Sequence, residues 1–348
     1  MPISKYIVNP DISVLDAIRA IDAGGKKVVF ICDDNKKLLG IFTDGDMRRF
    51  ILKNGDLSQP VINAMNISPV VFYSFDEAKG KMLHEKMVVY PIVDENNRLT
   101  NALFWNESPG QDVISEELSN VPLVLMAGGK GTRLYPFTKI LPKPLIPIGD
   151  YTISERIINN FVSFGCREVY FILNYRANMI KSYYNEIEKK YSVQYLEEKE
   201  FLGTGGGLSL LKGKIKGTFI VSNCDVLINA DIECIIKTHR EQKNKITFIC
   251  AMMNHEIPYG VIDLGCDGRI KCMKEKPSFS FLTNTGVYVL EAEVIERLKD
   301  DEFIHLPEIA QKYLDEGENV GIFPISEKSW LDMGQFNEME SMMKSLGV

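Results

Sequence analysis

The residues most suited to chemistry lie in one segment, LVLMAGGKGTRLYPFTKILPKPLIPIGD. An apolar run leads into a turn in which Gly128, Gly129 and Gly131 let the backbone approach an anion closely. Arg133 follows as a forked cation that suits phosphate oxygens. Lys143 stands between two prolines, which stiffen its backbone and aim its ammonium group. A flexible anion cradle followed by two aimed cations predicts a site that positions phosphates and stabilises their charge.

Other phosphate-binding patterns fit this segment poorly. The Walker pattern GxxxxGK[ST] does not occur. The stretch GKGTRL supplies two glycines of GxGxxG but has Leu134 at the third, which disfavours a dinucleotide-dependent oxidoreductase. A tight strand-to-helix turn with incidental basic residues is the structural alternative. The combined pattern GGxGTRLxPxTxxxPKPxxP makes that alternative the weaker interpretation.

The segments around this loop predict how it is held. From Val121 onward, short apolar runs such as VPLVLMA, REVYFIL and TFIVSNCD alternate with amphipathic stretches such as YTISERIINNFVSFG and DIECIIKTHREQK. Such alternation predicts crossover units, a mainly parallel sheet and helices on both faces. Ligands of these sheets bind at the carboxyl ends of the strands, which is where AGGKGTR, SNCD and MMNHEIPYG begin.

Residues 121–348 resemble the sugar-1-phosphate nucleotidylyltransferases. The signature AGGKGTRLYPFTKILPKPLIPI is followed, in the family's order, by LGTGGGL, SNCD, YGVI, KEKP, NTGVYVL and WLDMG. This family joins a nucleoside triphosphate to a sugar 1-phosphate and releases pyrophosphate. The resemblance implies an α/β fold, with a Rossmann-like mixed, mainly parallel sheet, and these two substrates as partners.

The resemblance also implies roles for individual residues. The expected catalytic residues are Arg133 and Lys143. The expected Mg²⁺ ligands are Asp225 and Asp332, because hard carboxylates bridged to phosphate oxygens suit this ion. The expected nucleotide-binding residues are Ala127, Gly128, Gly129, Gly131, Thr132, Glu198 and Gly203. The expected sugar-phosphate-binding residues are Gly260, Glu275, Lys276 and Thr285. Cys224 stands where the family more often has glycine, so the loop beside Asp225 departs from the usual pattern.

Base preference is read from YLEEKEFLGTGGGL. Guanine presents two adjacent donors, which a carboxylate can accept, whereas uracil and thymine suit an amide better. Glu198 aligns with the position that carries glutamine in thymidylyl enzymes, so GTP is favoured. A glucosamine, mannose or heptose 1-phosphate is the expected acceptor, and the whole architecture resembles enzymes of bacterial legionaminic-acid pathways. A uridylyl- or thymidylyltransferase acting on glucose 1-phosphate remains the alternative, as does a catalytically dead nucleotide sensor.

The first third of the chain contains a weak repeat. ICDDNKKLLGIFTDGD aligns with IVDENNRLTNALFWNE at an offset of 61, and both copies read as strand, polar turn and strand. The repeat resembles a pair of CBS domains, which implies that Thr43 and Asp46 of GIFTDGD bind the phosphate and ribose of a regulatory nucleotide. Phe104 replaces the threonine in the second copy. The alternatives are that the pair serves only as a scaffold or dimerisation module and that Asp46 only caps a helix.

These features predict an α+β CBS pair over residues 1–113, a linker over 114–120 and the catalytic domain over 121–348. The net charge of -7 disfavours a nucleic-acid or anionic-membrane partner. No apolar run approaches the roughly 20 residues of a membrane helix, and the N-terminal residues do not read as a secretory signal. Seven cysteines without a CxxC motif suggest reduced thiols. We expect a cytoplasmic homo-oligomer.

Overall fold

The computed structural model describes residues 3–82, 89–104, 118, 120–265 and 268–348. The chain divides into two compact units, Met1–Gln111 with Pro324–Lys328, and Asp112–Phe323 with Ser329–Val348. Most of the predicted linker lies outside the described residues. Its boundaries therefore stay a prediction, and each unit is described on its own. Among the helices described, none is long and apolar enough to cross a membrane.

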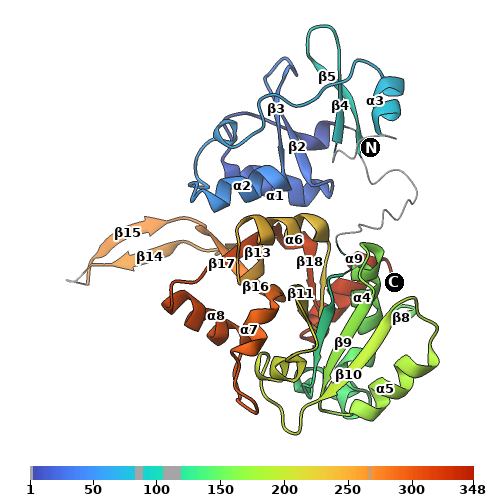
Figure 1. Ribbon diagram of the computed structural model, residues 1–348. Helices are drawn as coiled ribbons and strands as arrows, with labels where there is room; N and C mark the ends of the chain where they lie inside the picture. Colours follow the sequence, from blue (N-terminus) through green and yellow to red (C-terminus); the bar gives the residue numbers. More distant parts are fainter. Residues whose placement is uncertain (1–2, 83–88, 105–117, 119, 266–267) are drawn as a thin grey trace. The chain divides into compact units, whose positions relative to one another are not determined.

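The first unit contains two copies of one helix-and-hairpin element (Figure 1). The strand bounds and the first residue of each helix move by 61 positions between copies, from 28 to 89, 38 to 99 and 14 to 75. Both hairpins are antiparallel and have an irregularity at the equivalent position. The elements are α1 (Val14–Gly24), β2 (Val28–Cys32) and β3 (Leu38–Thr43), then α3 (Phe75–Met82), β4 (Val89–Val93) and β5 (Leu99–Phe104). The repeat predicted from the sequence is confirmed.

The turns of the two hairpins bind one another. Leu38 N donates to Asn97 O at 2.9 Å, and Leu99 N donates to Lys36 O at the same distance. Each turn has an aspartate at its start whose Oδ1 accepts two backbone N–H groups, Asp33 in the first copy and Asp94 in the second. Because the two sets of bonds are equivalent, the copies pair with each other, as the small size of each one requires.

The structure describes further elements of this unit outside the repeat. They are the 3-10 helix Ile3–Tyr6, β1 (Ile7–Val8), α2 (Asp44–Leu52) and the 3-10 helix Val61–Asn63. Ser13 caps the start of α1 by accepting from Asp16 N at 3.0 Å. The helix ends at Gly24, and the left-handed residue is the next one, Gly25, with φ of 70°.

The second unit is built on a seven-stranded sheet of order β10-β9-β6-β11-β16-β13-β17. Strands β10, β9, β6 and β11 are mutually parallel, whereas β16 runs antiparallel to both β11 and β13. The prediction of a mixed, mainly parallel α/β sheet is confirmed. The strands are β6 (Leu123–Ala127), β9 (Glu168–Leu173), β10 (Ser192–Glu197), β11 (Thr218–Asn223), β13 (Ile246–Glu256), β16 (Ser278–Glu291) and β17 (Val320–Ser326).

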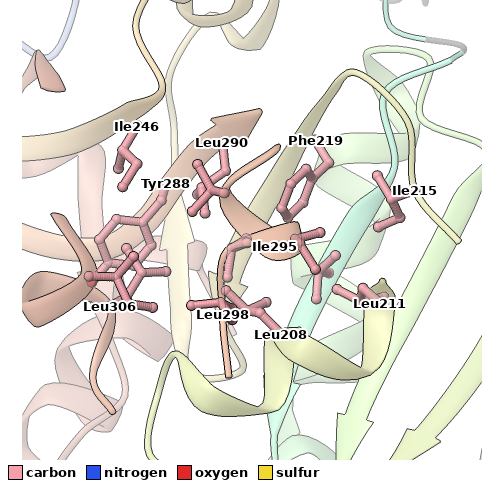
Figure 2. Close-up of a cluster of buried hydrophobic side chains, with 14 of the residues drawn as sticks. Leu208, Leu211, Ile215, Phe219, Ile246, Tyr288, Leu290, Ile295, Leu298 and Leu306 are labelled. Atoms are coloured by element: carbon pink, nitrogen blue, oxygen red, sulfur yellow. The ribbon is translucent and has the colours of Figure 1, made fainter. Parts of the chain in front are cut away.

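Helices connect these strands where the amphipathic stretches predict them. Thr152 and Glu155 form a capping box at the start of α4, as the sequence TISE favours. The helices are α4 (Ile153–Ser163), α5 (Ala177–Glu186), α6 (Ile232–Glu241), α7 (Ala292–Glu296), α8 (Leu306–Asp315) and α9 (Phe336–Leu346), with the 3-10 helix η8 (Gly206–Leu211). Figure 2 shows η8, β11, β16 and α7 contributing side chains to one apolar core, in which Leu208, Leu211 and Phe219 are fully buried.

Three small two-stranded sheets complete the part of this unit that the structure describes. β12 (Val226–Ile228) pairs with β18 (Trp330–Asp332), and β7 (Pro147–Ile148) pairs with β8 (Tyr151–Thr152). The third, β14 (Val261–Leu264) with β15 (Ile270–Lys274), projects from the body of the unit as a hairpin (Figure 1). The β12–β18 pair matters most for the site, because it brings the C-terminal segment to the loop that follows β11.

Candidate active site

A cavity of about 260 Å³ opens at the carboxyl ends of β6 and β11 and beside the loop that follows β10. This is the edge of the sheet that the sequence predicts. The cavity brings together nine of the predicted residues: Gly128, Gly129, Gly131, Thr132, Arg133, Lys143, Glu198, Gly203 and Asp225. It is also lined by Met126, Phe201, Thr204, Asn223 and Cys224, to which the sequence assigned no role.

The glycine-rich loop after β6 accommodates side chains as well as leaving space for a ligand. A Cβ placed on Gly128 would lie 2.5 Å from Oε2 of Glu198, so only glycine lets that carboxylate come so close. Gly131 has φ of 62°, and a Cβ there would lie 3.0 Å from Thr138 and 3.2 Å from Lys143. The loop therefore keeps its glycines partly for contacts with Glu198 and Lys143.

Lys143 and Asp225 form a buried ion pair between Nζ and Oδ2. The sequence separates them by 82 residues, and both side chains are almost fully buried. Lys143 follows Pro142 at the start of a short 3-10 helix, which fixes its direction as the proline-flanked sequence predicts. Lys143, the predicted cation, and Asp225, the predicted metal ligand, thus form an ion pair with each other. A ligand that contacts one of these side chains therefore lies next to the other.

Asp332 lies beside Asp225 because β12 pairs with β18. Val226 is opposite Asp332 in the register, and Met333 N donates to Asp225 O at 2.9 Å. The Oδ1 atom of Asp332 is buried and has no hydrogen-bond partner among the described residues. Burial, and then the nearby carboxylates of Asp225 and Glu338, raise the pKa of Asp332 to about 6, while Lys143 opposes the shift.

These carboxylates fit a divalent cation. An unpartnered buried oxygen next to a second carboxylate is the donor set of a hard cation that takes its other ligands from water and phosphate. Within the described part of the chain, no group of three or more His, Cys, Asp or Glu side chains could hold a metal by itself. Two carboxylates completed by a phosphate-bearing ligand agree with both observations.

Arg133 points its guanidinium across Gly334, the residue after Met333 in the WLDMG motif. A Cβ on Gly334 would lie 3.3 Å from Nη1 of Arg133, 3.2 Å from Oδ1 of Asp332 and 3.0 Å from Oε2 of Glu338. Arg133 makes no ion pair with any described residue, although the acidic group is close. Its charge therefore stays available for an anion in the cavity.

Glu198 follows the end of β10 and is only 6% exposed. Its Oε1 accepts from Leu202 N at 3.4 Å, which closes a turn, and Oε2 makes no hydrogen bond within the described residues. Burial raises the pKa of Glu198 to about 7, against the lowering effect of the Leu202 bond. A buried acceptor that is not fully used and lines a cavity suits a ligand with adjacent N–H donors.

The predicted sugar-phosphate residues do not line this cavity. Gly260 and Glu275 are neighbours, since a Cβ on Gly260 would lie 3.0 Å from Oε2 of Glu275. Lys276 is exposed and has φ of 42°, a left-handed conformation that is uncommon for lysine. Thr285 is buried, with its hydroxyl donating to Ile249 O at 2.7 Å. Ala127, the last residue of β6, is buried too.

The NTG motif has a structural role that the sequence did not predict. Gly286 has φ of 85°, and a Cβ there would lie 2.4 Å from Nδ2 of Asn223. The glycine therefore leaves room for Asn223, which lines the cavity two residues before Asp225. Burial raises the pKa of Cys224 between them to about 12, so this thiol stays protonated and inert.

Thr43 and Asp46 of the first unit are engaged with each other. Thr43 caps α2, and Oδ2 of Asp46 accepts from Thr43 N at 3.0 Å and from its Oγ1 at 2.6 Å. Oδ1 of Asp46 binds Arg49 at 2.5 Å. The helix-capping alternative describes these contacts fully, and a regulatory nucleotide at this position stays a prediction.

Comparison with protein families gives two matches. Residues 123–347 match the nucleotidyl transferase family, and residues 2–53 match the CBS domain. The CBS match covers the first of the two copies described above. The nucleotidyl transferase match covers more than half of the chain.

Curated relatives match the same region. The bifunctional protein GlmU of Methanococcus maripaludis is 32% identical over 208 residues, 57% of this chain and 48% of the relative. The catalytic subunit beta of mannose-1-phosphate guanylyltransferase from Drosophila pseudoobscura pseudoobscura is 31% identical over 183 residues, 51% of this chain and 49% of the relative. The chain thus spans about half the length of these two relatives.

Among solved structures, HddC from Yersinia pseudotuberculosis is similar in fold, with a TM-score of 0.51 and 23% identity over 65% of this chain and 99% of that chain. The shared fold, the residues gathered at the carboxyl edge of the sheet and the family match agree. The chain belongs to the nucleotidyl transferase family and carries a CBS domain at its N-terminal end.

Proposed function

We propose that this protein transfers a nucleoside monophosphate from a nucleoside triphosphate, with GTP favoured, to a sugar 1-phosphate. The products are a nucleotide sugar and pyrophosphate. The observation that carries the proposal is the meeting of Arg133, the Lys143–Asp225 pair, Asp332 and Glu198 at one edge of the sheet. Phosphate-binding cations and hard carboxylates are what nucleotidyl transfer needs.

The reaction would begin with a phosphate oxygen of the sugar 1-phosphate attacking the α-phosphorus in line, and pyrophosphate would leave. The nucleophile is already an anion, so no side chain has to act as a general base. Arg133 has no competing ion pair among the described residues and would neutralise the charge on the phosphates. The ammonium group of Lys143 would contact both the carboxylate of Asp225 and the α-phosphate. Removing one such contact costs about two to three orders of magnitude in rate.

Asp225 and Asp332 would hold Mg²⁺, which supplies Lewis-acid stabilisation of phosphate oxygens when bound. The unpartnered Oδ1 of Asp332 supports this assignment. The ion pair with buried Lys143 holds the carboxylate of Asp225 in place. Gly260, Glu275, Lys276 and Thr285 remain the proposed sugar-phosphate residues.

The preference for GTP rests on Glu198. Its Oε2 is available in the cavity, and a carboxylate can accept both the N1–H and N2–H₂ of guanine. Two of the relatives are named as mannose-1-phosphate guanylyltransferases, from Drosophila pseudoobscura pseudoobscura and Mycobacterium tuberculosis. Another, 28% identical over 234 residues, is named as a UTP–glucose-1-phosphate uridylyltransferase of Synechocystis, so uridylyl transfer to glucose 1-phosphate is the alternative.

The proposed acceptor, pathway and domain roles follow the expectations from the sequence. The expected acceptors are glucosamine, mannose or heptose 1-phosphate, in the synthesis of bacterial surface glycans or nonulosonic acids such as legionaminic acid. Residues 1–113 would form a regulatory or dimerisation module, 114–120 a linker and 121–348 the catalytic domain of a cytoplasmic homo-oligomer.

The test is to incubate the purified full chain with Mg²⁺, each of the four triphosphates and a panel of sugar 1-phosphates, and to measure pyrophosphate release. We expect the largest kcat/KM with GTP. Asp225→Asn should reduce turnover by about 100-fold or more, whereas Asp231→Asn, which removes only the N-cap carboxylate of α6, should not. No pyrophosphate with any pair of substrates would refute the proposal, and a preference for UTP would leave the reaction but reject GTP.

A further inference from the structure

One side chain of the cavity wall has no explanation in the chemistry above. Phe201 is 45% exposed and, among the described residues that line the cavity, is the one with an aromatic ring. A phenyl ring that faces water costs free energy unless a ligand covers it. Phosphates cannot do so favourably, because they are strongly hydrated anions.

The ring of Phe201 is supported from behind. Phe303 packs edge-to-face against it, with ring centroids 6.2 Å apart and planes at 71°. His305 packs in turn against Phe303, with centroids 5.2 Å apart. The His305 ring contacts Thr204 of the cavity wall at 3.2 Å. This row of rings stabilises the position of Phe201 without covering its exposed part.

The backbone around Phe201 is also fixed. Glu198 accepts from Leu202 N, so the turn that carries Phe201 is closed by the residue whose carboxylate lines the same cavity. A Cβ on Gly203 would lie 2.6 Å from Ile304 O, which shows how closely the turn packs on the segment that bears Phe303. Phe201 and Glu198 therefore form one preset surface, apolar at one residue and an acceptor at the other.

We infer that Phe201 is the stacking platform for the base of the bound nucleotide and that it favours purines over pyrimidines. The inference rests on the proposed function, because it assigns a residue to the nucleotide that this function requires. A base is flat and apolar on its faces and polar on its edge, which matches a ring beside a carboxylate. A purine has two fused rings and covers more of Phe201 than a pyrimidine does.

The two residues then divide the recognition. Phe201 distinguishes purine from pyrimidine by the area that it contacts. Glu198 distinguishes guanine from adenine, because adenine has no pair of adjacent donors on its Watson–Crick edge. The cations Arg133 and Lys143 hold the phosphates of any triphosphate and give no base selectivity.

The experiment measures, by calorimetry, the binding of GTP, UTP and inorganic tripolyphosphate to the full chain in the presence of Mg²⁺. We expect Phe201→Ala to lower the affinity for GTP by about 5- to 100-fold, the range for loss of base stacking. The affinity for UTP should fall less, and tripolyphosphate, which has no base, should bind as it does to the wild type. Phe201→Trp, which keeps an aromatic ring at this position, should retain the affinity for GTP that Phe201→Ala loses. In turnover assays the change should be in KM for GTP, with kcat and KM for the sugar 1-phosphate nearly unchanged.

Phe279→Ala is the matched control, because Phe279 is also a half-exposed phenylalanine but does not line the cavity. It should leave all three affinities unchanged. Unchanged GTP binding in Phe201→Ala would overturn the inference, as would an equal loss for GTP and tripolyphosphate. Binding of GTP that depends on Phe201 in a protein that makes no nucleotide sugar would support this inference and refute the proposed reaction, so the two failures are separable.

Discussion

Replacing Glu198 by glutamine exchanges one oxygen for one nitrogen and keeps the length of the side chain. In the wild type, Oε1 accepts from Leu202 N, and burial holds the pKa of the carboxyl at about 7. The glutamine can keep the Leu202 bond through its own Oε1. It presents an N–H group where guanine also presents donors, and it carries no charge to bury.

The substitution should increase stability at high pH. The folded-state pKa of Glu198 lies above the usual 4.5, so its ionised form is disfavoured in the folded protein. Its contribution to stability is fully present below about pH 4.5 and is lost as the pH rises through about 7. A shift from 4.5 to about 7 corresponds to about 3 kcal/mol. We expect about 2 kcal/mol, because the cavity admits water to the carboxylate.

Thermal unfolding at several pH values is the assay. For a domain of this size, about 2 kcal/mol corresponds to a rise in Tm of roughly 4–8 °C. Glu198→Gln should therefore show this rise near pH 8 and lose it as the pH approaches about 4.5. Glu200→Gln is the matched control, since Glu200 is an exposed acid in the same loop and its replacement should leave Tm nearly unchanged.

The same variant tests recognition of the base. Loss of two hydrogen bonds to a charged acceptor should lower kcat/KM for GTP by about 100-fold, while UTP should lose much less. In the wild type, KM for GTP should fall as the pH rises through about 7, because the carboxylate is the form that accepts both donors. A stability difference that does not depend on pH would refute the account of Glu198 as a buried, poorly solvated acid. An undiminished GTP preference in Glu198→Gln would refute its role in base choice.

Three further outcomes follow from the site. Asp332→Asn removes a buried charge that faces two other carboxylates, so Tm should rise by about 2–4 °C; added Mg²⁺ with GTP should then stabilise the variant less than the wild type in the same thermal scan. Lys143→Met leaves Asp225 buried and unpaired and should cost about 3 kcal/mol in urea unfolding, most of which the double variant with Asp225→Asn should recover. Gly128→Ala places a Cβ 2.5 Å from the mobile end of Glu198, so Tm should change by less than about 3 °C while KM for GTP rises about tenfold; an unchanged KM would contradict the contact.

The parts of the fold that follow from local pattern could be predicted from the sequence. The 61-residue repeat is an example, because each copy carries its own strand and turn residues, including Asp33 and Asp94. The mainly parallel sheet is another, since alternating apolar and amphipathic segments leave few other arrangements. The motif also located one wall of the cavity, because its glycines and Arg133 closely follow one strand.

Contacts between distant segments could not be predicted. The sequence gives no sign that Lys143 pairs with Asp225, 82 residues away. A lysine that was expected to face the substrate therefore also forms an ion pair with the expected metal ligand. The same holds for Thr204 and His305, which are 101 residues apart. Phe201 was overlooked because a single phenylalanine in a polar loop has no periodicity. Glu338 was overlooked because it lies on α9, beyond the last of the family motifs.

The role of the glycines in this site is a further consequence of those distant contacts. A glycine-rich loop after a strand is usually explained by the anion that it binds. Gly128 instead leaves space for Glu198, Gly286 leaves space for Asn223, and Gly334 lies where Arg133 and Asp332 converge. In each case a missing side chain on one segment lets a functional side chain of another reach the site. The glycines of the three motifs therefore help to set the positions of the acid, the amide and the cation. Substituting Gly128 or Gly334 should alter specificity more than stability, because the displaced atoms are the ends of flexible side chains, whereas φ of 85° at Gly286 would strain any other residue.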